Sequence, residues 1–325
     1  MRDLALTHVQ HALYGHPWAI LPEKLDEIVV AFERRRAGVV ASEDEVVEAR
    51  LQARKVAAAA VGGSVRDVAG MSVTQVGRVA ILPMHGTMVQ KPGIFTKYSG
   101  GTSAEQFAAA HEALVNDGGV KSIIWDCDTP GGSVCGLPEA HDRIMAVRGR
   151  KRTVALCNSL MCSAGYYLAS AADEISSTPS GMTGSIGTVM AHADYSEANA
   201  KDGVKVTYIH AGKYKVEANS DEPLNDEARD YLQQVVDDYY GQFVQAVAKG
   251  RRVGEQQVRS GYGEGRTFVA HRAQSIGLVD RVESLSDLLK RLGAYESERP
   301  AGGASARLRV AEAELGLSQT QGMTR

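Results

Sequence analysis

A serine at the start of an apolar segment is the residue in this sequence best placed for nucleophilic chemistry. Ser163 stands between Cys162 and the small pair Ala164-Gly165, at the start of a segment that reads as a buried helix. Helices begin with unpaired N–H groups and a partial positive charge, which favour developing negative charge. Ala164 and Gly165 allow a substrate backbone to come close. The pattern alone is also typical of a simple serine cap, so a catalytic interpretation needs partners.

Two glycines supply the first partner. Gly131 and Gly132 follow residues 121–126, which read as a buried strand. Backbone N–H groups that no side chain covers are what an oxyanion hole requires. Ordinary strand-to-helix turns contain the same residues, so this signal is weak when it stands alone.

A lysine supplies the second partner. Lys215 follows the strand-like residues 204–209, and a lysine with a lowered pKa can take the proton of a serine. Because free lysine has a pKa of about 10.4, the shift must be about three units, or about 4 kcal/mol. Glu217 would oppose that shift if it shared a face with Lys215 in an extended chain, so the chain must turn there or hold Glu217 in solvent. Ser185 is placed to orient the lysine by a hydrogen bond.

The order and spacing of five segments resemble the signal-peptide-peptidase-A-like serine proteases, a family of the Clp protease/crotonase fold. The segments, within residues 78–291, are DTPGGS, CSAGYYLAS, TGSIGT, AGKYK and GRTFVAHRAQSIGLVD. The resemblance implies a Ser/Lys dyad with Ser163 as nucleophile and Lys215 as general base. Lys213 is not chosen, because the family pattern places the base after the aromatic residue.

The same resemblance implies an oxyanion hole made of backbone N–H groups. Gly132 is the first choice of donor, and Gly131 is the second. The N–H of Ala164, directly after the nucleophile, is the other expected donor.

Composition excludes several functional classes. The 325 residues include 44% hydrophobic and 23% charged residues with a net charge of −3, which is typical of a soluble protein with no general affinity for nucleic acid or an anionic membrane. The four cysteines form no CxxC pair, so we expect reduced thiols rather than disulfides. No cofactor and no metal are expected. The lack of a signal peptide or an apolar span predicts no membrane anchor and a cytoplasmic location.

The chain divides into three predicted parts: a helical extension over residues 1–75, a protease domain over residues 76–293 and a flexible tail over residues 294–325. Alternating strands and helices in the middle part predict an α/β fold with parallel strands, and the resemblance implies stacked ββα units. In the extension, periodicity predicts helices near residues 22–36 and from Ser42 to Gly62.

Other mechanisms and classes remain as alternatives. A Ser-His-Asp triad could draw on the histidines, and Cys162 is a second potential nucleophile beside Ser163. A crotonase-type acyl-CoA enzyme would share the fold without needing the serine and lysine. A catalytically silent scaffold or interaction protein is the non-enzyme alternative.

The segment GHPWAI near the N-terminus resembles the bacteriophage branch of the family, the capsid assembly proteases. This resemblance implies processing of scaffold, portal or other head proteins, and of the protease itself, in the host cytoplasm or inside the prohead. The runner-up role is a bacterial cytosolic peptidase that degrades peptides. The resemblance also implies an active site shared between protomers, because family members with one copy of this domain complete the site across a subunit boundary. Each motif occurs once here, and the helix predicted over residues 224–250 is rich in aromatic residues, so we expect a homo-oligomeric ring.

Overall fold

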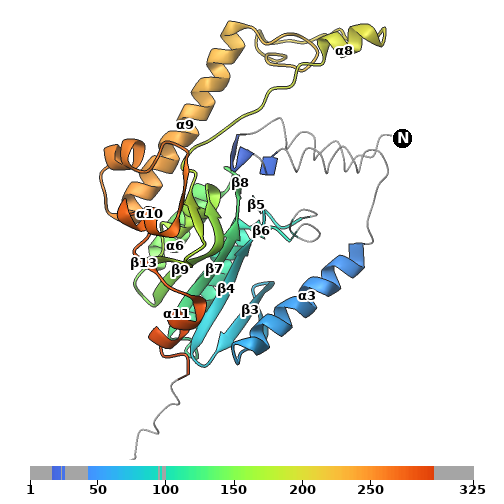
Figure 1. Ribbon diagram of the computed structural model, residues 1–325. Coiled ribbons are helices and arrows are strands. Elements are labelled where there is room, and N and C mark those ends of the chain that lie inside the picture. The colour runs from blue at the N-terminus through green and yellow to red at the C-terminus, as the bar shows by residue number, and fades with distance from the viewer. Residues whose placement is uncertain (1–16, 23, 26–42, 94–95, 97–99, 296–325) are drawn as a thin grey trace, which may run out of the picture.

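The computed structural model describes residues 17–22, 24–25, 43–93, 96 and 100–295 (Figure 1). Its strands are β1 Trp18–Ile20, β2 Ser64–Val68, β3 Met71–Val76, β4 Val79–His85, β5 Met88–Val89, β6 Thr102–Ser103, β7 Ser122–Thr129, β8 Gly131–Ser133, β9 Arg152–Cys162, β10 Glu174–Ser177, β11 Met182–Gly184, β12 Thr267–Val269 and β13 Arg281–Val282. Its helices are α3 Glu43–Ala60, α5 Ala104–Asn116, α6 Leu137–Val147, α7 Ala164–Ala169, α8 Ser196–Lys201, α9 Asp226–Arg251, the π-helical turn η1 Gln257–Gly261, α10 Ala270–Ser275 and α11 Leu285–Arg291.

A nine-stranded sheet forms the body of the described chain. Its main order is β12-β11-β9-β7-β4-β3-β2, and β10 and β13 extend it from β9. The central strands β4, β7 and β9 are parallel, and β2 and β3 add an antiparallel hairpin beside β4. The α/β fold expected from sequence is therefore confirmed.

Alternate residues of the central strands enter two separate cores. On β7, Ile123 and Trp125 belong to the larger core under α5, α6, α7 and the end of α9, whereas Ile124 belongs to a smaller core under α11. All three side chains are fully buried. Because side chains alternate across a strand, a continuous apolar run of this kind indicates a sheet covered on both faces.

A small second sheet lies at the carboxyl end of the central strands. Its order is β1-β8-β5-β6, and β8 carries Gly131 and Gly132. The two glycines are required by crowding, since a Cβ on Gly132 would lie 2.0 Å from the carbonyl oxygen of Met88. The chain thus forms a strand of bare backbone, between β1 and β5, close to the end of β9.

The N-terminal part differs from the all-helical extension predicted over residues 1–75. The helix expected from Ser42 is present as α3, but residues 64–76 form the β2–β3 hairpin and residues 18–20 form β1. The turns at Gly62 and Gly70, both with positive φ, divide this region into strands that complete the sheet. The helix expected near residues 22–36 lies mostly outside the described residues, as does most of the predicted tail.

An arm made of residues 190–225 extends from the body at the far end of α9 (Figure 1). The predicted long helix is present as α9, but most of its buried residues lie near its C-terminal end, including Phe243 and Val247. The strand expected over residues 204–209 does not form. Within the described chain no neighbouring strand pairs with this segment, so its backbone lacks the partner that a strand requires.

Candidate active site

Ser163 sits at a sharp junction between β9 and α7. Its φ of 54° and ψ of −117° are rare for a residue with a side chain, because the Cβ is crowded there. Two backbone hydrogen bonds fix the junction: the Ser163 N–H donates to Gly184 O at 2.9 Å, and its carbonyl accepts from the Tyr167 N–H at 2.9 Å. A strained serine at a strand-to-helix turn is the geometry that exposes the nucleophile in many hydrolases.

The Ser163 hydroxyl is buried and unpartnered. The residue is 1% exposed, and its Oγ has no hydrogen-bond partner among the described residues. A buried hydroxyl without a partner costs about 1–3 kcal/mol, so this group is held for a purpose other than stability. The same observation shows that no described histidine is hydrogen-bonded to Ser163, and the triad alternative is not assembled in the described chain.

Thr129 holds the serine loop against the glycine strand, and the sequence analysis did not select it. Its Oγ1 donates to Gly86 O at 2.6 Å and accepts from the Gly131 N–H at 3.2 Å. Its methyl group would lie 2.4 Å from a Cβ on Gly165. Its position at the end of a strand, just before Pro-Gly-Gly, was the signal that could have identified it.

The structure brings most of the predicted site residues together. Gly131, with φ of 107°, approaches the nucleophile closely, since a Cβ on it would lie 2.8 Å from the Ser163 Cβ. Ser185 follows Gly184, whose carbonyl accepts the Ser163 N–H. Ala164 is the first residue of α7, where helical N–H groups have no partner within the helix. The oxyanion and orienting roles of these residues stay predictions.

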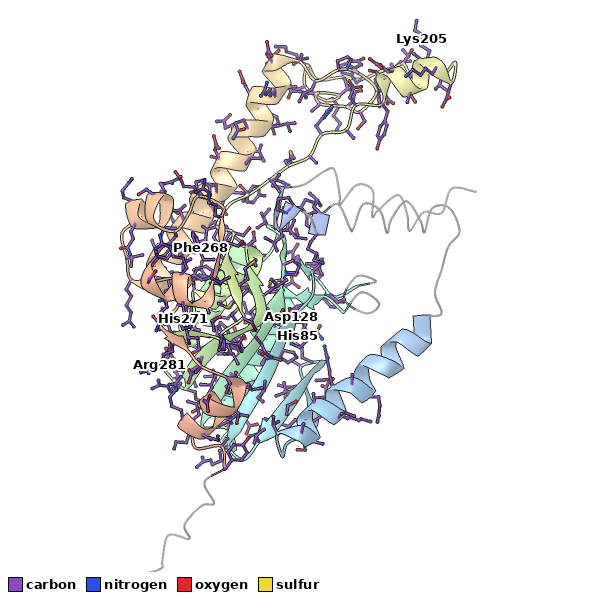
Figure 2. The ribbon with its side chains drawn as sticks, in the orientation of Figure 1. His85, Asp128, Lys205, Phe268, His271 and Arg281 are labelled. Carbon is purple, nitrogen blue, oxygen red and sulfur yellow. The ribbon has the colours of Figure 1, made fainter. Side chains whose placement is uncertain are left out.

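Lys215 is the predicted residue that the single chain keeps apart. It is exposed in a turn of the arm, in which the Lys215 N–H donates to Gly212 O at 3.2 Å and the Glu217 N–H donates to Tyr214 O at 3.2 Å. The chain therefore turns between Lys215 and Glu217, as the dyad hypothesis requires. Figure 2 shows the separation on a larger scale, with Lys205 at the tip of the arm and Phe268 on the body.

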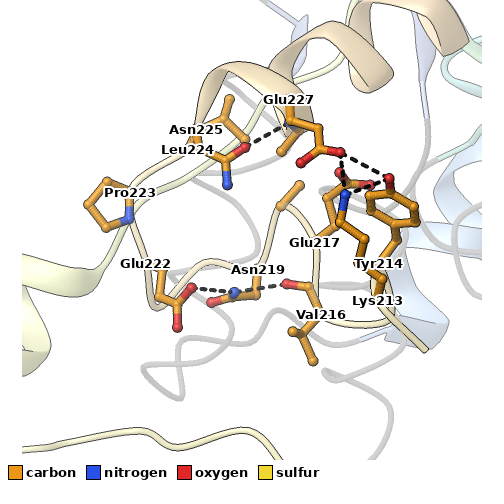
Figure 3. Close-up of a pocket in the computed structure, with 12 residues that line it drawn as sticks. Lys213, Tyr214, Val216, Glu217, Asn219, Glu222, Pro223, Leu224, Asn225 and Glu227 are labelled. Carbon is orange, nitrogen blue, oxygen red and sulfur yellow. Dashed lines mark hydrogen bonds and ion pairs between the residues drawn. The ribbon is translucent and has the colours of Figure 1, made fainter. Parts of the chain in front are cut away.

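Lys213 is occupied by another interaction. Its Nζ lies 2.8 Å from the Glu227 carboxylate and 2.8 Å from the Tyr214 hydroxyl (Figure 3). These hydrogen bonds, to Glu227 first, raise the pKa of Lys213 above its usual value. A lysine held in its charged form is a poor base, which favours Lys215 over Lys213.

The buried histidines have structural partners. His111 Nδ1 lies 3.4 Å from Trp125 Nε1, and His141 Nε2 lies 3.3 Å from Ser170 Oγ. Burial lowers the pKa of both to about 4, so both are neutral near pH 7.

The four cysteines are free thiols. Burial raises the pKa of Cys157 to about 12, and Cys162 Sγ contacts the carbonyl of Met182 at 3.6 Å.

A strained serine at the end of a parallel strand is the arrangement that serine hydrolases use. Residues 146–297 match peptidase family S49, in agreement with the family that the sequence motifs predicted. No described helix has the length and apolar character needed to cross a membrane.

Relatives in phages and plants agree with this family. The chain is 36% identical over 211 residues to capsid assembly protease C of Escherichia phage lambda, covering 65% of this chain and 48% of that protein. It is 32% identical over 235 residues to the head-tail preconnector protein GP5 of Enterobacteria phage P21, covering 72% and 46%. The chloroplastic serine protease SPPA of Arabidopsis thaliana is 26% identical over 210 residues, covering 64% and 31%. The chain thus spans about half the length of the two phage relatives.

Proposed function

We propose that this protein is a serine endopeptidase that uses Ser163 as nucleophile and Lys215 as general base. Lys215 Nζ takes the proton of Ser163 Oγ as the oxygen attacks the peptide carbonyl, and the N–H groups of Gly132 and Ala164 stabilise the oxyanion. The observation that carries the proposal is the strained, buried Ser163 hydroxyl, which has no partner among the described residues.

The lysine would reach the serine from a neighbouring copy of the chain. In one chain Lys215 belongs to the arm and Ser163 to the body, and the arm exposes apolar side chains, with Ile209 at 99% and Tyr208 at 42%. Apolar exposure on a projecting segment indicates a protein interface. Because desolvation lowers the pKa of a lysine, an interface that covers the arm would also favour a neutral base.

The names of the two phage relatives supply the proposed role. One is a capsid assembly protease and the other a head-tail preconnector. We therefore assign the protein to the assembly of a phage head, with scaffold, portal or other head proteins as substrates and self-processing as a further reaction.

The first test is Ser163→Ala. The variant should lose cleavage of a head-protein substrate and of itself, while its denaturation midpoint stays at or above that of the parent chain, because the substitution removes a buried hydroxyl without a partner among the described residues. Wild-type proteolysis by this variant would contradict the assignment. If neither the parent chain nor the variant cleaved any substrate, the result would support the silent-scaffold alternative.

A mixing experiment tests the shared site. Ser163→Ala and Lys215→Ala chains are each expected to be inactive, and a co-assembled mixture should recover part of the activity by joining an intact serine to an intact lysine. No recovery despite proven co-assembly would show that both residues act within one chain.

A further inference from the structure

The strand β1 is bonded along both edges at the carboxyl end of the sheet. On one edge, Trp18 and Val189 exchange two backbone hydrogen bonds of 2.8 Å each, and on the other the Leu21 N–H donates to Pro130 O at 3.0 Å. The antiparallel register pairs Ala19 with Gly132. Bonded pairs alternate along an antiparallel ladder, so Ala19 and Gly132 form the next bonded pair after Leu21 and Pro130.

This strand also covers the nucleophile. A Cβ on Gly131 would lie 2.2 Å from the carbonyl oxygen of Ala19, 2.8 Å from the Ser163 Cβ and 3.0 Å from the Ile20 Cα. The peptide unit between Ala19 and Ile20 and the side chain of Ser163 therefore converge on one point. Ser163 and Ala19 are each 1% exposed, because the strand and the serine loop cover one another.

We propose that the channel between β8 and Val189 is the groove that binds peptide substrates, and that residues 18–21 are its built-in occupant. An extended peptide would bind there by adding a strand, with main-chain hydrogen bonds on both edges. The segment of residues 18–21 already makes these bonds and so competes with substrate for Gly132 and Ser163. This inference rests on the proposed peptidase function for the nature of the ligand.

The groove selects a small apolar side chain at one position. Ala19 lies against a small cavity whose other lining residues include Val134, Leu137, Tyr167 and Phe243. The unfilled space measures about 10 Å³, which is about the volume of one water probe. A substrate residue at this position should therefore be alanine or slightly larger, and a charged residue should be excluded.

Tethering makes the occupant an effective competitor. A ligand joined to its site by a short chain has an effective concentration on the order of millimolar. A free peptide that binds the open groove more weakly than this would not displace residues 18–21, so the isolated chain should bind peptide poorly until β1 leaves.

A binding assay in full-length Ser163→Ala protein tests the groove without any catalysis. The probe is a fluorescent hexapeptide with the sequence of residues 17–22, and its affinity is measured by anisotropy. Adding Ala19→Asp places a carboxylate against the apolar cavity and should release β1, so peptide affinity should rise at least about ten-fold. The matched control is Ala57→Asp, at an exposed alanine of α3, which should leave affinity unchanged. Equal affinity of the two double variants would overturn the proposal.

Hydrogen exchange of the Ser163→Ala chain gives a second test that needs no further variant. Unlabelled hexapeptide, added well above the millimolar effective concentration of the tethered strand, should speed exchange of the Trp18 amide, because β1 is displaced, while Val189 stays protected by the incoming peptide. Slow exchange at Trp18 under saturating peptide would overturn the proposal even if Ala19→Asp failed to fold. Peptide binding without hydrolysis by the parent chain in its assembled form would instead reject the peptidase function and leave the proposed groove intact.

Discussion

The body around Ser163 and the arm around Lys215 differ in how closely their residues are packed. In the body, close backbone packing fixes each predicted site residue, and Gly131, Gly132 and Gly165 have no room for a Cβ. In the arm, residues 203–215 are all exposed, and Gly212 has nothing within 4 Å of an added Cβ. The comparison teaches that Ser163 is packed in place within one chain, whereas the described residues of that chain supply no packing surface for Lys215.

The largest expected effect comes from Lys215→Arg. Arginine keeps the charge but cannot act as a base near neutral pH, so kcat/KM should fall at least about 1,000-fold, equivalent to about 4 kcal/mol. Unfolding free energy should change by less than about 0.5 kcal/mol, because the side chain is exposed. Peptide hydrolysis and urea denaturation measure the two quantities. The control is Lys213→Arg, which can keep the ion pair with Glu227 and should stay active. If Lys213→Arg were inactive and Lys215→Arg active, Lys213 would be the base instead.

The same substitution at two glycines of contrasting packing should have opposite effects on stability. Gly165→Ala would place a Cβ 2.4 Å from the Thr129 methyl group, whereas Gly241→Ala, at a half-buried position of α9, meets nothing within 4 Å. The first should destabilise by about 1–3 kcal/mol, and the second should stabilise by about 0.5–1 kcal/mol. Chemical denaturation checks both, and equal changes would contradict the packing contrast.

Acid should weaken the body through its buried histidines. His111 and His141 have pKa values lowered to about 4 by burial, so the unfolded chain, with histidine pKa values near 6.5, binds more protons between these limits. Stability is complete above about pH 6.5 and falls as the pH drops toward 4, by as much as about 3 kcal/mol for each histidine. Urea denaturation midpoints measured across this pH range should depend less on pH in His111→Gln than in the parent chain, because one histidine that resists protonation in the folded state has been removed.

The smallest effect on folding should come from the arm surface. Ile209 is 99% exposed, so Ile209→Ser should alter the unfolding free energy of the chain by less than about 0.5 kcal/mol. The same change should lower the assembled fraction in light scattering, because it removes apolar area from the proposed interface. A variant that assembles normally would exclude Ile209 from that interface.

Local patterns predicted much of the body. The apolar run of residues 121–126, predicted to be a buried strand, is present as β7, and the helix predicted from Ser42 is present as α3. The strand predicted over residues 204–209 failed because a strand needs a partner, and a local pattern carries no information on which neighbour supplies it. The strand β1 was missed for the same reason, since its partners Gly131–Ser133 and Val189 are far away in sequence.

The sequence by itself determined the residue types and their order: the serine before two small residues, the glycine pair after a strand, the lysine after a strand-like segment and the family that these motifs indicate. Only the tertiary structure decided which of them meet. Close packing brought Ser163 to Gly131 and Gly184, placed β1 over the nucleophile and left Lys215 on an arm. The physical reason is that motif chemistry is local, whereas the distances between motifs depend on strand pairing and burial across the whole chain.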